Sequence, residues 1–244
     1  MSIESHHLHL TNIRKWSDLY YNTDLRFFKH SGNCLSDLLK CKEGHLLKID
    51  SWDNYVLKDA YTRSKKLKHI NLVKYICYFE YEEDIIDYLT NDEQDANEHN
   101  AIVIRPYYKS FDECPDSVNI IKQIILFFYT ALYTLKVEFG DISEIYIDEQ
   151  DKVKKISYVI NGIHYEIKSK YIVKFDDFEN MTVVKEIDYI CYNMLYINIV
   201  KALRKVKCNE NLITLVESFI REEKIYKVID PKKILDTLLS SVSI

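Results

Sequence analysis

The clearest periodic pattern in the chain lies between residues 117 and 135, where apolar side chains recur every three or four positions. This spacing predicts an α-helix, and Asp116 or Ser117 suits its N-cap. Apolar residues occur on both sides of the helix, so we expect it to be central and buried. The residues that define the pattern are Ile120, Ile121, Ile124, Phe127, Phe128, Ala131, Leu132 and Leu135.

Shorter segments rich in β-branched and aromatic residues predict strands. Three of them lie in the first half of the chain, at 45–50, 71–83 and 101–108, and the last is stopped by Pro106. Residues 155–178 predict a hairpin that turns at Asn161-Gly162, the type I′ signal, followed by a further strand.

Four more segments predict helices, at 53–70, 186–206, 211–224 and 231–242, with Pro231 at a first helical position. The apolar face of the first should run through Val56, Ala60 and Leu67. The first hundred residues are therefore strand-rich with one helix, and the rest is mainly helical. This order predicts an α+β chain of two lobes, 1–105 and 106–244, joined near Arg105–Ser110.

Composition narrows the classes of partner. The chain has 244 residues, is 47% hydrophobic and carries a net charge of −5. It can bury a sizeable core, and it has no overall basic field, so we expect no nucleic-acid or membrane partner. The basic stretches at 63–69 and 201–207 suit solvated helix faces. Six cysteines without a CxxC pair indicate a reducing, intracellular location, which could be cytoplasm, nucleus or the interior of a virion.

Two local features bear on chemistry. Only four glycines are present (32, 44, 140 and 162), so any glycine-rich phosphate loop must use one of them. The stretch KFDDFEN, residues 174–180, ends a β-branched run with clustered acids. It is either a strand that ends in a solvated charge cluster or a strand that presents a carboxylate to a metal.

Several stretches together resemble the protein kinase family. LKHINLVKYICYFE (67–80) resembles the pattern after the regulatory helix, and VEFGDISEIYI (137–147) resembles the catalytic loop. YIVKFDDFEN (171–180) resembles the strand that leads into the D-F-G motif. EIDYICYNML (186–195) resembles the helix that opens with a buried aspartate, here Asp188. The hairpin with its Asn-Gly turn is closer still to haspin-type kinases and to kinase-like proteins of large DNA viruses.

The resemblance implies a bilobal fold with a truncated helical C-lobe, and ATP and Mg²⁺ as cofactors. Lys48 matches the lysine that holds the α- and β-phosphates, and Gly32 lies in the stretch that matches the nucleotide-covering loop. Asp59 is the acid nearest to the position that pairs with this lysine. Ile104 and Arg105 lie where the connector between the lobes begins. The resemblance implies that they are nucleotide-binding positions.

Three carboxylates match the catalytic set. Asp141 matches the aspartate that orients or deprotonates the acceptor hydroxyl, and Asp177 matches the magnesium ligand. Glu144 is the candidate for the second metal position. Asp176 should point to the opposite face from Asp177, because strand side chains alternate.

The departures from the family pattern are equally specific. The nucleotide loop keeps one glycine of three, and Tyr146 stands where the second metal ligand, an asparagine, is expected. Only the nine residues Glu179–Ile187 separate Phe178 from Asp188, where kinases carry an activation segment.

Three interpretations follow. The chain is a pseudokinase that acts as a binding or scaffold module for a protein partner. Alternatively, it is a minimal active Ser/Thr kinase that uses Lys48, Asp141 and Asp177. The third interpretation is an unrelated α+β domain, in which KFDDFEN is a solvated strand end.

Overall fold

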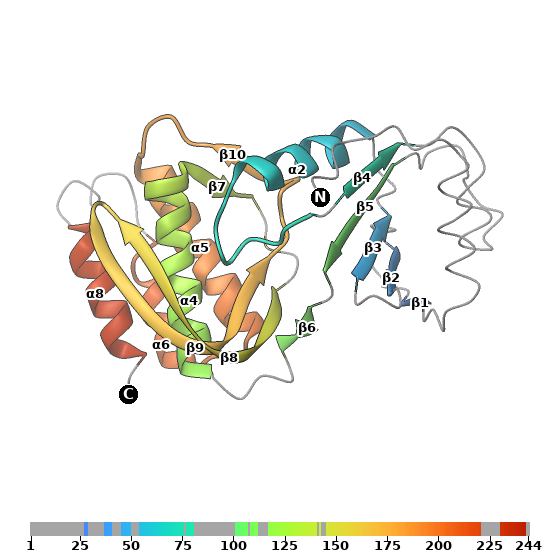
Figure 1. The fold of residues 1–244 in the computed structure, drawn as a ribbon. Coiled ribbons are helices and arrows are strands. Elements are labelled where there is room, and N and C mark those ends of the chain that lie inside the picture. The colour runs from blue at the N-terminus through green and yellow to red at the C-terminus, as the bar shows by residue number, and fades with distance from the viewer. Residues whose placement is uncertain are drawn as a thin grey trace. The chain divides into compact units, whose positions relative to one another are not determined.

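The structure is a computed structural model of the full chain. It describes residues 27–28, 37–40, 45–49, 54–75, 77–80, 101–106, 108–111, 117–140, 142, 145–220 and 230–242. Helices and small antiparallel sheets are mixed, so the predicted α+β class is confirmed (Figure 1). The chain divides into two compact units, Met1–Lys68 with Val73–Tyr107, and His69–Leu72 with Tyr108–Ile244.

The first unit contains a five-stranded antiparallel sheet in the order β1-β2-β3-β5-β4. Lys48 lies in the central strand β3, between Leu38 of β2 and Val103 of β5. The strand predicted at 71–83 is shorter in the structure, because residues 73–75 form no strand. The strands are β1 (Phe27–Phe28), β2 (Asp37–Lys40), β3 (His45–Ile49), β4 (Cys77–Glu80) and β5 (Ala101–Pro106).

One helix of the first unit, α2 (Asn54–Lys66), contacts β4 and β5. Its buried side runs through Ala60, which is fully buried, and Ser64. Val56 is 38% exposed, so the predicted apolar face was wrong at that position.

The second unit is built around α4 (Ser117–Thr130), which continues into the π-helical turn η3 (Ala131–Leu135). Residues 123–132 are buried without interruption, so the prediction of a central helix is confirmed. The segment Ser117–Leu135 has the length and apolar composition of a membrane span. Its apolar side chains fill the protein core instead, where Phe127 stacks on Phe175 with ring centroids 4.4 Å apart.

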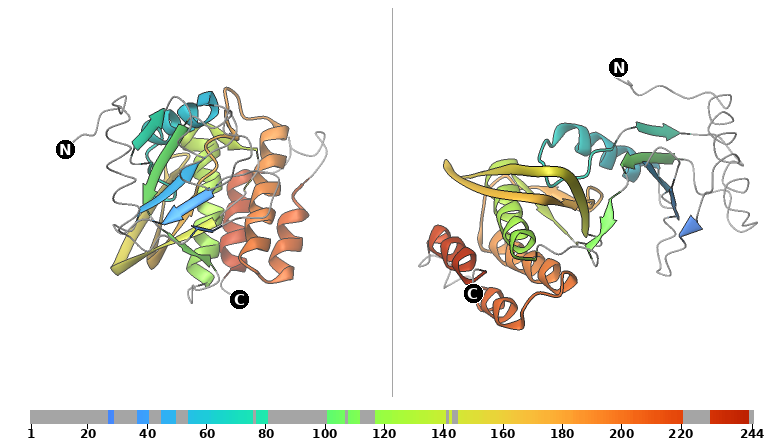
Figure 2. Two further views of the ribbon diagram at one scale, coloured as in Figure 1. Left: turned by 90° about the vertical axis from the view of Figure 1, so that its right-hand side faces the viewer. Right: turned by 60° about the horizontal axis from the view of Figure 1, so that its bottom comes forward.

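The hairpin of β8 (Ile145–Ile160) and β9 (Ile163–Phe175) covers one side of α4, and α5, α6 and α8 lie on the other (Figures 1 and 2). Asn161 and Gly162 have φ angles of 50° and 77°, as the type I′ prediction requires. The further strand predicted after the hairpin is part of β9 itself. Short β6 (Lys109–Ser110) pairs with β8 near its start.

The remaining elements are β7 (Val137–Phe139), β10 (Met181–Val183), α5 (Tyr189–Lys205), α6 (Glu210–Glu217) and α8 (Pro231–Ser241). α6 ends before the predicted 224. Pro231 occupies the first turn of α8, as predicted, and Asp230 caps that turn through the backbone N–H of Lys232. The segment at 8–30 shows no clean period in its sequence, and of its residues the structure describes Phe27 and Phe28 alone. The stretch TNDEQDANEHN (90–100) has no apolar spine, so its sequence predicts an exposed loop. It lies outside the described residues.

Candidate functional site

The candidate site is built where β7 and β10 pair as a two-stranded antiparallel sheet. Phe139 lies opposite Met181, and the backbone N–H of Gly140 donates to the carbonyl of Asn180 at 2.7 Å. A Cβ on residue 140 would lie 3.0 Å from that carbonyl oxygen, so glycine suits this close approach. Residues 139–140 and 180–181, far apart in sequence, therefore lie side by side in the structure.

The two aspartates of KFDDFEN are buried. Asp176 is 3% exposed and Asp177 1%, and Phe178 is fully buried. Lys174, at the start of the stretch, is 8% exposed. The interpretation of this segment as a solvated strand end is therefore wrong. Asp176 is buried as deeply as Asp177 just after β9 ends, where strict strand alternation no longer applies.

The end of β9 is held by a turn from an earlier part of the chain. The carbonyl of Asn71 accepts from the N–H of Phe175 at 2.8 Å, and Leu72 forms a parallel bridge to Phe175. The Asn71 side chain donates to the carbonyl of Val173 at 2.8 Å and accepts from the hydroxyl of Tyr158 at 2.9 Å. This turn fixes the strand from which Asp176 and Asp177 emerge.

Gln123 of α4 forms hydrogen bonds with the same edge of β9. Its side chain donates to the carbonyl of Tyr171 at 2.7 Å and accepts from the N–H of Val173 at 3.0 Å. Asn71 also donates to its amide oxygen at 3.2 Å. Because β9 is an edge strand, these amides replace the hydrogen bonds that a neighbouring strand would supply.

Lys174 is a buried lysine with three neighbours. Its Nζ donates to the carbonyl of Ile70 at 2.7 Å, lies 3.6 Å from an Asp148 carboxylate oxygen and lies 5.5 Å from the centre of the Tyr108 ring. Burial lowers its pKa, while Asp148 opposes the shift. Its ammonium joins β9 to three other parts of the chain, the turn at Ile70, β8 at Asp148 and the segment at Tyr108.

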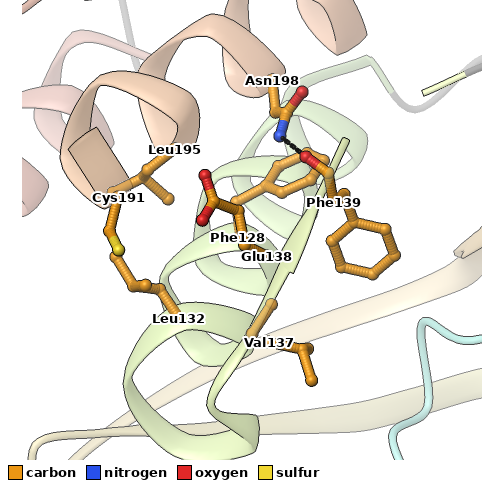
Figure 3. Close-up of a pocket in the computed structure, with 9 residues that line it drawn as sticks. Phe128, Leu132, Val137, Glu138, Phe139, Cys191, Leu195 and Asn198 are labelled. Atoms are coloured by element: carbon orange, nitrogen blue, oxygen red, sulfur yellow. Dashed lines mark hydrogen bonds between the residues drawn. The ribbon is translucent and has the colours of Figure 1, made fainter. Parts of the chain in front are cut away.

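A hollow lies behind β7, between α4 and the first turns of α5 (Figure 3). It encloses about 210 Å³, part of it open solvent, and its lining is mainly apolar. Glu138 and Asn198 line it, and Asn198 donates to the carbonyl of Phe139 at 2.6 Å. Burial raises the pKa of Glu138, and the charge of Asp188 raises it further. Burial also raises the pKa of the Cys191 thiol, which makes that thiol a poor nucleophile.

The structure describes some of the predicted nucleotide-binding residues and not others. Lys48 is placed in β3, and Ile104 and Arg105 in β5 opposite Leu47 and Leu46, by their backbones alone. Asp59 is exposed and pairs with Arg63 of the next helical turn at 2.5 Å. Gly32 lies outside the described residues. A pairing of Asp59 with Lys48 stays a prediction.

The same holds for the predicted catalytic and metal-binding residues. Asp177 is described, whereas Asp141 and Glu144 lie outside the described residues. Within the described residues, no group of three or more His, Cys, Asp or Glu side chains could hold a metal. Two of the three carboxylates assigned to the site are not among those residues, so a metal site that uses them stays a prediction.

The expected burial of Asp188 is wrong. Its side chain is exposed and caps its own helix by accepting from the N–H of Cys191 at 2.9 Å. Asn198, three turns further along α5, makes the contact to the strand that leads to Asp141. Sequence reasoning missed Asn198, Asn71 and Gln123. A single amide inside an apolar run, as in IIKQIIL and YINIV, is the signal that could have found two of them.

No protein-family model matches the chain, and no curated protein matches its sequence.

Proposed function

We propose that the chain is a degenerate protein-kinase-like domain that acts as a binding or scaffold module, with ATP and Mg²⁺ as candidate ligands. The order of elements supports this proposal. The strand with Lys48 precedes a helix, two strands and a connector, and a long buried helix then leads to the FGD segment. A hairpin and the buried Asp177 follow, in the order that the resemblance implies.

The observation that carries the proposal is the pairing of β10 with β7. The segment Glu179–Ile187 is held at two points, by the hydrogen bond from Gly140 to Asn180 and by that from Val184 to the carbonyl of Lys136 at 2.8 Å. Three residues between them form β10. This short, fixed segment offers no loop of the kind with which kinases bind a peptide substrate.

The burial of Asp177 supports the same conclusion. A carboxylate that binds magnesium must reach the ion and its phosphate ligands. At 1% exposure, Asp177 has no direct access to solvent. Catalysis would require this segment to move, against the β7–β10 hydrogen bonds.

One observation favours the alternative, a minimal active Ser/Thr kinase. The hydrogen bond from Gly140 to Asn180 brings the residue before Asp141 beside the turn that follows Asp177. Phosphoryl transfer needs its acceptor-orienting acid and its metal-binding acid close together. The alternative requires transfer of the γ-phosphate of ATP to a protein hydroxyl without an activation segment.

Two measurements on the full chain separate these functions. Phosphate transfer from labelled ATP with Mg²⁺ or Mn²⁺ should stay at the level of an Asp177→Asn variant. Transfer by the unmodified chain that is lost in Asp177→Asn, and retained in the exposed control Glu186→Gln, would establish the active kinase instead. Thermal unfolding with ATP, with and without metal, reports separately whether nucleotide binds, because a ligand of the folded form raises the midpoint.

A further inference from the structure

The far half of the β8–β9 hairpin has an open edge. β8 lies between β6 and β9, but β6 pairs only with Ile147 and Tyr146. Beyond that point, no described strand lies on the outer side of β8. Near the hairpin tip, the Thr134 hydroxyl donates to the carbonyl of Val159, so η3 covers the last residues of the edge.

The register shows which backbone groups face outward. Ile160 and Ile163 close the two-residue turn, and hydrogen-bonded pairs alternate from there with non-hydrogen-bonded pairs. Ser157 and Lys155 therefore fall in non-hydrogen-bonded pairs, and their N–H and C=O groups point away from β9. The outward carbonyl of Lys168, bonded by Asn119, agrees with this register. Among the described residues, nothing bonds the outward groups of Lys155 and Ser157.

Lysines gather on this half of the hairpin, on both β8 and β9. Lys155 lies directly opposite Lys168, and like charges in facing positions destabilise a sheet. Glu166 pairs with Lys155 and offsets one charge of the two. A bulge between Glu149 and Lys154 projects Val153, which is 62% exposed. The exposed lysines of this surface are Lys152, Lys154, Lys155, Lys168 and Lys170.

We propose that the β8 edge from Lys152 to Ser157 is a docking site for an extended acidic segment of a protein partner, which adds to the sheet as a further strand. Outward backbone groups would supply the hydrogen bonds of strand addition. Lys155 and Lys168 form a facing pair and so share one face of the hairpin. Carboxylates at alternate positions of the partner strand also lie on one face, where they would meet these lysines. This docking site does not rest on a kinase-like function, because it uses the hairpin alone.

The surrounding charge favours a short acidic segment over a longer polyanion. The chain as a whole has a net charge of −5, so a nucleic acid or an anionic membrane that extends past the lysines meets repulsion. The hairpin has no arginine to bind phosphate through two hydrogen bonds. A peptide of a few residues can contact the lysines without reaching the acidic rest of the protein.

Lysines also protect edge strands against aggregation without binding anything. The test must therefore detect binding and show that it uses the backbone. The probe is a fluorescein-labelled peptide of alternating glutamate and threonine, about ten residues long, titrated against the full chain by anisotropy. A second probe has the same sequence with its alternate amides N-methylated, so that it cannot donate along the edge.

We expect saturable binding of the first probe and about tenfold weaker binding of the N-methylated one. A variant that changes Lys152, Lys155, Lys168 and Lys170 to glutamine should bind at least about tenfold more weakly. The matched control removes four exposed lysines elsewhere, Lys205, Lys207, Lys232 and Lys233, and should bind within about twofold of the unmodified chain. Hydrogen exchange should slow at Lys155 and Ser157 in the complex.

Four results would overturn the proposal. The first is no binding of the acidic peptide at low salt. The second is equal weakening in the control variant, which would indicate a response to overall charge. The third is equal affinity for the N-methylated probe. The fourth is tighter binding of duplex DNA or phosphatidylserine vesicles at the same lysines.

Discussion

The side-chain amide of Asn198 in α5 donates to the backbone carbonyl of Phe139 at 2.6 Å, one residue before Gly140. Asn198 is 1% exposed, and its amide oxygen accepts no hydrogen bond from the described residues. A buried amide with one strong partner holds the end of β7 against the helix. Both α5 and β10 therefore position the end of β7, which leads to the candidate catalytic loop.

Replacing Asn198 by leucine should lower the free energy of unfolding by about 1–3 kcal/mol, because the Phe139 carbonyl is left buried without its donor. Urea unfolding measures this change. Asn119→Ala is the matched control, since its amide also donates to a backbone carbonyl, that of Lys168, at 3.4 Å in an exposed position. Equal losses in both variants would show that burial does not decide the strength of the Asn198 contact.

The Asn71–Gln123 pair should behave as one unit. Asn71 donates to Gln123 at 3.2 Å, and both amides bond the edge of β9 around Val173. Asn71→Ala leaves the buried carbonyl of Val173 without the Asn71 donor, and Gln123→Ala leaves the N–H of Val173 without the Gln123 acceptor, so each should cost about 1–3 kcal/mol. The double variant should cost less than the sum by about 0.5 kcal/mol or more. Additive losses in a double-mutant cycle by urea unfolding would contradict this coupling.

Sequence patterns predicted the elements that are long and locally specified. The repeat over 117–135 spans enough turns to identify α4, and Asn161-Gly162 fixed the hairpin through its turn geometry. The three-residue strands VEF and MTV carry no such pattern. Their pairing as β7 and β10 is a contact between distant segments, and that pairing builds the candidate site.

The wrong predictions concern burial and contacts between distant segments, which local sequence patterns specify poorly. Residues 71–75 have strand-forming composition, yet Asn71 and Leu72 bond β9 instead, because tertiary contacts override strand propensity. Asp188 was expected in the interior, and it is an exposed helix cap. The burial of Asp176 and Asp177 could not be read from the sequence, because adjacent acids at a strand end are usually solvated.

The hairpin turn should depend on glycine at one position. Gly162 has a φ of 77°, and a Cβ added there would meet no atom within 4 Å, so backbone conformation alone decides the outcome. Gly162→Ala should cost about 1 kcal/mol, because a Cβ disfavours the left-handed region. Thermal unfolding measures the change. Gly162→Asn, which tolerates that region better, should recover part of the loss; an alanine variant as stable as the unmodified chain would contradict the strain argument.

His69 should make the stability depend on pH in mildly acidic solution. Burial, and to a lesser extent the charge of Lys174, lowers its pKa from 6.5 to about 4. Its Nδ1 accepts from the N–H of Asn71 at 3.2 Å, which requires the neutral ring. The unfolded chain therefore binds a proton more readily than the folded chain between these two values, and stability falls as the pH falls from about 6.5 to about 4.

The loss that His69 contributes is up to about 3 kcal/mol, from the difference between the two pKa values. Carboxylates titrate in part of the same range, so the measurement is a comparison. Urea unfolding from pH 7 to pH 4 should show a smaller decrease for His69→Gln than for the unmodified chain, since glutamine does not titrate. Parallel curves for the two proteins would show that His69 is not held neutral, and that the contact of its turn with β9 tolerates a charge.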